Sequence, residues 1–276
     1  MTPEDFERLQ TLLASRTGYR LGRERMSLAS HRLGPVARRE GYDSAPELLA
    51  ALWARPVASQ AWAVIEALLN PETWFRRERA TFDVYTRELL PALSAARGGR
   101  PVRVWSAGCS TGQEAWSLAI GAAEAGAPVE ILATDLNARA LDKARSGLYT
   151  GFEIQRGLSA ATMLAHFDQV EDQWSVSQSL RAMVTFQRAN LLEPPAPDSA
   201  AGEPRFDVIF CRHVLIDMEP GRRSAMLDAL ERRLVDDGCL FLGGEERLEG
   251  DSVAFRPVSG RKGLYVKTPA LLRRAA

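Results

Sequence analysis

The sequence predicts an α/β protein in which a small all-helical domain precedes a parallel β-sheet covered by helices on both faces. Over residues 5–69, apolar side chains recur at helical spacing, as in Phe6, Leu9, Leu12 and Leu13. From Val102 onward, short apolar runs of strand length alternate with stretches of helical periodicity. This alternation is typical of parallel strands joined by crossover helices.

Residues 1–70 are therefore expected to form the helical domain, and residues 71–276 the α/β domain. Within the α/β domain the apolar runs predict strands over 102–105, 129–133, 183–186, 206–211 and 239–242. The helical patterns between some of these runs cover 113–125, 138–146 and 220–235. A glycine-rich turn followed by Gly263-Leu264-Tyr265-Val266 predicts a terminal hairpin over 256–267.

Two segments interrupt this pattern. Residues from about 147 to 182 are too many for a plain connection in such a fold, so they are expected to form a small inserted subdomain. The segment 193–205 is rich in proline, alanine and glycine, and we expect a surface loop there.

The charge balance argues against two classes of partner. Lys plus Arg and Asp plus Glu both number 35, so no global charge favours nucleic acid or a membrane surface. The N-terminus carries Glu4 and Asp5 where a secretory signal would be basic. No apolar run approaches the roughly 20 residues that span a bilayer. The sequence thus predicts a cytoplasmic protein with no direct membrane insertion.

Cysteine usage predicts neither disulfides nor a metal site. The cysteines are odd in number, widely spaced and set in apolar runs, so buried free thiols are expected at Cys109, Cys211 and Cys239.

One segment departs from the overall neutrality. Between Arg16 and Arg39 there are seven arginines and a single acid, Glu24, which gives a local net charge of +6. The segment is either a solvated helical face or a docking surface for an acidic protein partner.

The first expected strand leads into the small-residue loop Ser106-Ala107-Gly108-Cys109-Ser110-Thr111-Gly112-Gln113-Glu114. Its glycines let a ligand approach the backbone closely, and the helix after Gly112 turns free amide groups toward that ligand. The loop lacks the Gly-x-Gly-x-x-Gly pattern of nicotinamide-binding proteins. Alone, it is also consistent with a tight strand-to-helix connection.

Polar residues follow the next three strands. The Asp135 carboxylate ends the second strand, where it can accept hydrogen bonds from both hydroxyls of a ribose. The alternative is a helix cap for the segment that begins at Asn137. Asn190-Leu191-Leu192 follows the third strand and Cys211-Arg212-His213-Val214 the fourth. The carboxyl ends of parallel strands meet at one edge, so these residues are expected to surround an adenosine.

Taken in order, these segments resemble the motifs of the CheR methyltransferases. The resemblance rests on residues 71–78 (Pro-Glu-Thr-Trp-Phe-Arg-Arg-Glu), 104–114, 133–135, 143–149, 190–192 and 210–214. It covers nearly the whole chain, the helical N-terminal domain included. It implies a Rossmann-like S-adenosylmethionine methyltransferase fold.

The resemblance also implies a function. CheR proteins transfer a methyl group from S-adenosylmethionine to glutamate side chains of chemoreceptors, leaving S-adenosylhomocysteine. The implied partner is the cytoplasmic domain of a chemoreceptor or a similar signalling protein, for which the helical domain would be a docking module. A glutamate is already ionised at neutral pH, since its ordinary pKa is about 4.3, so such a transfer requires no general base.

Site residues follow from the same resemblance, position by position. The cofactor-binding residues that it implies, together with Gly108 of the small-residue loop, are Thr73, Arg77, Gly108, Glu114, Asp135, Asn190, Leu191, His213 and Val214. Arg77 is also the candidate catalytic residue, because a guanidinium can orient a carboxylate through paired hydrogen bonds.

The chain departs from the family pattern at several positions. His213 stands where the family has Asn, Asp217 where it has Tyr, and Arg76 where it has a second Phe; Gly243-Gly244-Glu245-Glu246 replaces Gly-His-Ser-Glu. Two alternatives to protein methylation therefore stay open. One is a catalytically impaired regulatory protein that binds the cofactor or its product, and the other is a small-molecule methyltransferase of the same fold.

Overall fold

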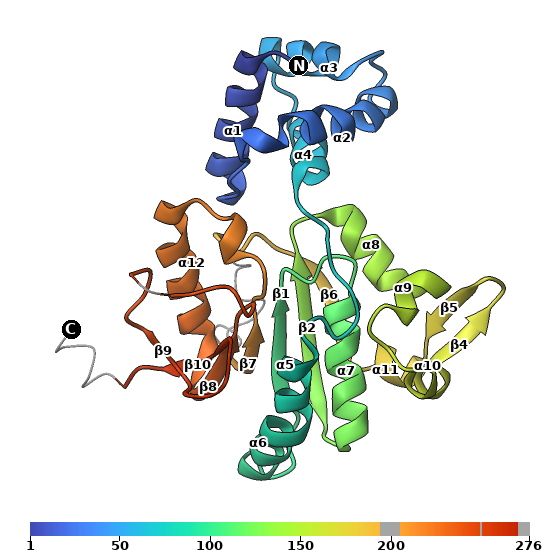
Figure 1. Cartoon of the computed structure of the whole chain (residues 1–276), viewed down its shortest axis with the longest axis vertical. Coiled ribbons are helices and arrows are strands. Elements are labelled where there is room, and N and C mark those ends of the chain that lie inside the picture. Colours follow the sequence, from blue (N-terminus) through green and yellow to red (C-terminus); the bar gives the residue numbers. More distant parts are fainter. Residues whose placement is uncertain (194–204, 249, 270–276) are drawn as a thin grey trace, which may run out of the picture. The chain divides into compact units, whose positions relative to one another are not determined.

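The computed structural model describes residues 1–193, 205–248 and 250–269. The chain divides into two compact units, Met1–Asn70 with Asp217–Arg222, and Pro71–Ile216 with Arg223–Ala276 (Figure 1). Each has its own hydrophobic core. Residues 194–204, most of the expected surface loop, lie outside the described residues.

The first unit is helical, as predicted. Its helices are α1 (Pro3–Thr17), α2 (Met26–Arg39), α3 (Ala45–Ala54) and α4 (Ala58–Leu68). Helix α1 begins with a capping box in which the side chains of Thr2 and Asp5 each accept the other's backbone N–H. The apolar residues at helical spacing form the core, among them Phe6, Leu9, Leu13, Leu33, Leu48, Leu49 and Val64.

The second unit contains a mixed sheet of order β6-β2-β1-β7-β8-β10-β9. Its strands, in chain order, are β1 (Val102–Ala107), β2 (Val129–Asp135), β6 (Val184–Arg188), β7 (Phe206–Phe210), β8 (Leu234–Phe241), β9 (Phe255–Pro257) and β10 (Leu264–Lys267). The pairs from β6 to β8 are parallel, whereas β10 pairs antiparallel with β8 and β9. The predicted parallel sheet and terminal hairpin are both confirmed.

Helices α7 (Gln113–Ala125), α8 (Ala138–Ser146) and α12 (Pro220–Arg233) lie in the connections between parallel strands, as parallel pairing requires. Helix α5 (Arg79–Val84), the π-helical turn η2 (Tyr85–Leu89) and α6 (Leu90–Ala96) precede β1. Helices α7 and α8 cover the predicted residues.

Strand β8 begins at Leu234 rather than at Cys239, and α12 ends correspondingly earlier than predicted. The apolar pattern missed the first residues of β8 because they include Asp236 and Asp237. The structure satisfies Asp237 with Arg97, which donates to both of its carboxylate oxygens at 2.8 and 2.9 Å.

The residues between α8 and β6 form a second sheet of order β3-β5-β4. Its elements are β3 (Leu148–Thr150), α9 (Gly151–Gln155), α10 (Ala160–His166), β4 (Phe167–Val170), β5 (Gln173–Val176) and α11 (Gln178–Arg181). The strands pair antiparallel. Arg181 ties the segment together by donating to the backbone carbonyls of Val176, Arg145 and Ser146.

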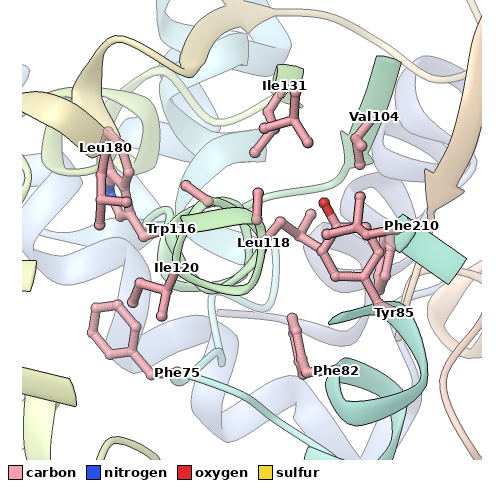
Figure 2. Close-up of a cluster of buried hydrophobic side chains, with 14 of the residues drawn as sticks. Phe75, Phe82, Tyr85, Val104, Trp116, Leu118, Ile120, Ile131, Leu180 and Phe210 are labelled. Carbon is pink, nitrogen blue, oxygen red and sulfur yellow. The ribbon is translucent and has the colours of Figure 1, made fainter. Parts of the chain in front are cut away.

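Helix α7 lies at the centre of the core of the second unit (Figure 2). Trp116 and Ile120 lie on one side of it with Phe75 and Leu180, while Leu118 faces Tyr85 and Phe210. The ring of Phe75 packs edge-on against Tyr149, with 5.0 Å between the ring centroids. Because Phe75 is fully buried, the segment preceding α5 is anchored against the sheet, and this fixes the polar residues on either side of it.

All three cysteines are buried and free, as predicted. No helix in the described part of the chain is both long and apolar enough to cross a lipid bilayer.

Candidate active site

The predicted site residues lie in segments at the carboxyl ends of the parallel strands and in the segment preceding α5. Gly108 follows β1, Asp135 ends β2, Asn190 follows β6 and His213 follows β7. In open parallel sheets this edge is where ligands bind.

The loop between β1 and α7 has a backbone that only small residues tolerate. Gly108 has φ +86°, and a Cβ atom there would come within 2.8 Å of Val214 Cγ2. Gly112 has φ +93°, and a Cβ would come within 2.7 Å of Ala144 Cβ. The amides of Gly108 and Cys109 both donate to the carbonyl of Thr134, which fixes the loop to the end of β2. Gly108 and Val214 thus lie against each other, as the predicted site requires.

The Asp135 carboxylate holds two backbone segments together. Its Oδ2 accepts the N–H of Ser110 at 2.7 Å and its Oδ1 accepts the N–H of Asn137 at 2.8 Å. The cap of α8 is Asn137 itself, whose Oδ1 accepts from Arg139 N and Ala140 N. Asp135 is therefore not the helix cap. It is half-buried at the carboxyl end of β2.

Asn190 and Leu191 start the turn after β6. Asn190 Oδ1 accepts the N–H of Leu192 at 3.1 Å, and the Asn190 carbonyl accepts that of Glu193 at 3.0 Å. The preceding residue, Ala189, donates to the carbonyl of Asp135 at 3.1 Å. This contact places the turn beside the end of β2.

A buried ionic cluster, made up of Glu78, Glu114 and Arg212, lies at the start of α7. Arg212 Nη1 donates to Glu114 Oε2 at 3.1 Å, and Arg212 Nη2 donates to Glu78 Oε2 at 2.9 Å. Glu114 Oε1 also accepts the Ser106 hydroxyl at 2.8 Å. The Arg212 side chain is only 1% exposed. Although burial opposes its ionisation, the hydrogen bond and charge of Arg212 lower the pKa of Glu78.

Glu246 fastens the loop after β7 to the loop after β8. Its carboxylate accepts the backbone N–H groups of His213, Gly243 and Ile216 at 2.8, 2.7 and 3.1 Å. The residue is 5% exposed, and this burial raises the pKa of its carboxyl group. Gly244 N in turn donates to both carboxylate oxygens of Glu78, which connects the ionic cluster to the same loop.

His213 is held in an unusual backbone conformation, with φ +59°. Its Nε2 lies 3.5 Å from Glu78 Oε1, too far for a good hydrogen bond, and is buried with no partner among the described residues. Burial, and after it the charges of Arg77 and Arg212, lower the pKa of this imidazole to about 4. His213 is therefore neutral at physiological pH and has a ring nitrogen to offer to a ligand.

Arg77 stacks on an aromatic ring, and within the described part of the chain no salt bridge joins it to an acid. Its guanidinium carbon lies 4.3 Å from the centroid of the Trp74 ring, and Nη1 donates to the carbonyl of Glu72 at 3.0 Å. Arg156 also lies over the Trp74 ring, at 4.0 Å. Burial lowers the pKa of Arg77. The planar guanidinium is thus oriented while most of its donors stay available for an anion.

Thr73 is the least connected predicted residue. It is half-buried, and no hydrogen bond within the described residues joins its side chain to the rest of the site. The neighbouring Pro71 carbonyl accepts the Ser110 hydroxyl at 2.9 Å, which brings this segment to the loop after β1.

Asp217 belongs to the helical unit. Its carboxylate pairs with Arg25 at 3.1 Å, and its side chain is 16% exposed. Asp217 is one of the departures from the family pattern, and Arg25 balances the charge of its carboxylate.

Three residues that structure the site were noted in the sequence only as parts of motifs and were not among the predicted site residues: Glu78, Arg212 and Glu246. The available signal was Arg212, a charged residue directly after the apolar run Val208-Ile209-Phe210-Cys211 that includes the end of β7. A buried arginine needs an acidic partner, but the sequence does not say which of 35 acids supplies it.

Comparisons with known proteins show which family the chain resembles. Residues 71–264 match the family model described as CheR methyltransferase, SAM binding domain. The chemotaxis protein methyltransferase Cher2 of Pseudomonas putida is 32% identical over 89% of this chain and 91% of its own length. Chemotaxis protein methyltransferase 1 of Pseudomonas aeruginosa is 34% identical over 88% of this chain and 90% of its own. WspC of Pseudomonas aeruginosa, a probable biofilm formation methyltransferase, is 35% identical over 67% of this chain and 43% of its own length.

Proposed function

Because this chain belongs to the CheR methyltransferase family, with S-adenosylmethionine as its cofactor, we propose that it methylates glutamate side chains of a chemoreceptor or a related signalling protein. Its site of action would be the cytoplasmic domain of that receptor. The relatives named for chemotaxis support a chemoreceptor as the substrate. The similarity to WspC, which is named for biofilm formation, supports a related signalling protein as the alternative substrate.

The single observation that carries the proposal is the fixed orientation of the Glu114 carboxylate at the start of α7. Its two oxygens accept from the Ser106 hydroxyl and from Arg212 Nη1, and its side chain is 12% exposed. Two bonds leave about half of the acceptor sites of a carboxylate unused. A carboxylate held in this way can accept hydrogen bonds from a cationic group, and the amino group of S-adenosylmethionine supplies one.

The remaining residues fit the rest of the cofactor. We assign the amino group to Glu114, the ribose hydroxyls to Asp135, and the adenine to the turn at Asn190 and Leu191. Gly108 gives the backbone access that a side chain would block. The buried, unpartnered Nε2 of His213 supports a polar ligand atom nearby, with Val214 as its apolar neighbour.

When bound, the cofactor supplies an electrophilic methyl group on its sulfonium sulfur. The residues of this chain then need only orient the attacking carboxylate and exclude water. Arg77 is the orienting residue that we propose, since its fork of donors matches a carboxylate. Cys109 and Cys211 take no part as nucleophiles, because burial raises the pKa of both thiols well above the usual value.

Asp217 keeps a second candidate function open, that of a regulatory protein that binds the cofactor without turnover. The residue replaces the family's tyrosine, and its ion pair with Arg25 gives it a structural role in the helical unit.

One experiment separates the two candidates. The protein is incubated with S-adenosylmethionine that carries a radioactive methyl group and with membranes from its own organism. The proposal requires methyl label that enters protein and is released by base, as a glutamate methyl ester would be. As a control, Asp135→Ala should reduce the labelling. Tight cofactor binding without any labelled protein would favour the regulator, and no binding of cofactor or product would exclude both.

A further inference from the structure

Arg212 lies at a junction of four segments of the second unit. It follows β7, donates to Glu114 at the start of α7, and donates to Glu78 and to the carbonyl of Arg77 in the segment before α5. Its guanidinium also lies over the ring of Phe82, 5.4 Å from the centroid. Through Glu78 it is connected to Gly244, in the loop after β8.

Burying such a cation costs several kcal/mol unless geometry and hydrogen bonding are good. The fork of the guanidinium satisfies this condition, because Nη1 and Nη2 serve different carboxylates. A lysine has a single ammonium group and cannot bridge both in the same way. The role of Arg212 thus depends on shape as well as on charge.

The effect of Arg212 on Glu114 is directional. One oxygen of Glu114 is held by Arg212 and the other by Ser106, so the carboxylate plane is fixed from two sides. Two bonds leave about half of its acceptor sites unused. The carboxylate is therefore both oriented and still able to accept from a ligand.

We infer that Arg212 is a positioning residue that orients Glu114 toward the amino group of S-adenosylmethionine. This inference rests on the proposed function, in which Glu114 receives that group. Arg212 acts through Glu114 and has no contact of its own with the cofactor in this assignment. Its loss should affect recognition of the amino-acid part of the ligand and spare recognition of the adenosine.

Two ligands make the inference testable by calorimetry. S-adenosylhomocysteine carries the amino-acid part, whereas 5′-methylthioadenosine keeps the adenosine and lacks that part. Arg212→Lys should weaken S-adenosylhomocysteine by roughly tenfold or more, the usual effect of losing a hydrogen bond to a charged group. The affinity for 5′-methylthioadenosine should change less than about twofold, because Asp135 and the loop after β1 are untouched.

Arg97→Lys is the matched control. Arg97 also bridges two carboxylates, those of Asp207 and Asp237, and Asp207 lies at the opposite end of β7. This variant should lower thermal stability and leave the affinities for both ligands unchanged. If Arg212→Lys weakened the two ligands equally, Arg212 would be a structural residue and the inference would be wrong.

A charge-balanced double variant, Arg212→Met with Glu78→Gln, separates orientation from charge and serves even if Arg212→Lys does not fold. It removes one positive and one negative charge, so the net charge of the cluster stays the same. The inference requires S-adenosylhomocysteine to bind more weakly than to the unmodified protein, with 5′-methylthioadenosine unaffected. Unchanged affinity for S-adenosylhomocysteine would overturn it. Failure of the unmodified protein to bind either ligand would instead refute the proposed function.

Discussion

Strained backbone is concentrated at the candidate site. Among the described residues, the non-glycine positions with positive φ are Arg76, Glu78, Ser110, Glu171 and His213, and all but Glu171 lie in the site segments. Such conformations cost about 1–3 kcal/mol each and persist where the surroundings impose them. At His213 the imposing contact is visible, since the amide of this residue is held by the buried Glu246. The family's Asn and the His found here both tolerate this conformation better than most residues do.

His213 predicts a pH dependence of stability. Its pKa in the folded protein is about 4, below the ordinary value of 6.5. Between these pH values the unfolded chain takes up a proton that the folded one does not, so stability falls as the pH drops from 6.5 to 4. His213→Asn removes the titrating group. In urea titrations across this window, the unfolding free energy of the unmodified protein should decline more steeply than that of the variant. Above pH 7 the two should run parallel.

The control for this comparison is His31→Asn, which replaces an exposed histidine. Equal slopes for the unmodified protein and His213→Asn would mean that the imidazole is not shielded from water as the structure indicates.

Arg77 predicts a separation of turnover from binding. Arg77→Lys keeps the charge but loses the paired donors and the flat surface that stacks on Trp74. We expect turnover to fall by roughly 10- to 100-fold, as for the loss of a hydrogen bond to a charged group, while the affinity for S-adenosylhomocysteine changes much less. Steady-state methylation kinetics and calorimetry measure the two. Arg79→Lys, at an exposed position of α5, should leave both unchanged, and near-normal turnover of Arg77→Lys would refute the catalytic role.

At the scale of elements, the sequence predicted those parts of the fold that depend on local pattern. Strands β1 and β2 and helices α7 and α8 are each recognisable from apolar periodicity alone, because burial on one or both faces dictates it. The predicted start of strand β8 was too late in the sequence, because its first residues include Asp236 and Asp237, which break the apolar run. In the structure Arg97 pairs with Asp237.

The candidate site was also predictable only in part, because some of its contacts join residues that lie far apart in the sequence. Loop glycines and the acid at the end of β2 stand out in the sequence. The pairing of Arg212 with Glu114 joins residues that are 98 positions apart, and its pairing with Glu78 spans 134. Such partnerships depend on the assembled sheet, so no local pattern indicates them.

A glycine with positive φ flanks each end of α7, Gly112 before it and Gly126 after it, and the two predict different losses of stability on substitution by alanine. Gly112→Ala adds a methyl group at φ +93° that would meet Ala144, so we expect a loss of roughly 2–4 kcal/mol from strain and overpacking together. Gly126→Ala, after the end of the same helix, has φ +62° and open space around it. It should cost about 1 kcal/mol. Urea denaturation of the two variants gives the comparison, and equal losses would mean that contact with Ala144 contributes nothing.

For the whole molecule, overall neutrality conceals an uneven distribution of charge. The seven arginines between Arg16 and Arg39 do not share one role. Arg25 pairs with Asp217 and donates to the Tyr19 hydroxyl, and Arg32 donates to the carbonyls of Leu68 and Leu69. These two are half-buried and hold the helical unit together. The remaining five are exposed: Arg16, Arg20, Arg23, Arg38 and Arg39.

The sequence left two interpretations of the arginine-rich segment, a solvated face and a docking surface for an acidic protein. Reversing the charge of exposed arginines tests the docking surface. If the segment docks an acidic protein, Arg20→Glu with Arg23→Glu should raise the apparent KM for the protein substrate, and more so at low salt, where attraction between exposed charges is least screened. Affinity for S-adenosylhomocysteine should stay unchanged. Arg25 is excluded from the variant because its loss would leave the Asp217 carboxylate without its partner.

The control is a double reversal of equal size on the other unit, Arg232→Glu with Arg256→Glu, both at exposed positions. General repulsion between enzyme and an acidic substrate depends on net charge, so it would raise KM by the same factor in both double variants. A local docking surface acts through the positions of the charges, so only the Arg20 and Arg23 variant should respond. If both variants had unchanged KM from low to high salt, the arginine-rich segment would be a solvated face, and recognition of the substrate would have to reside elsewhere on the chain.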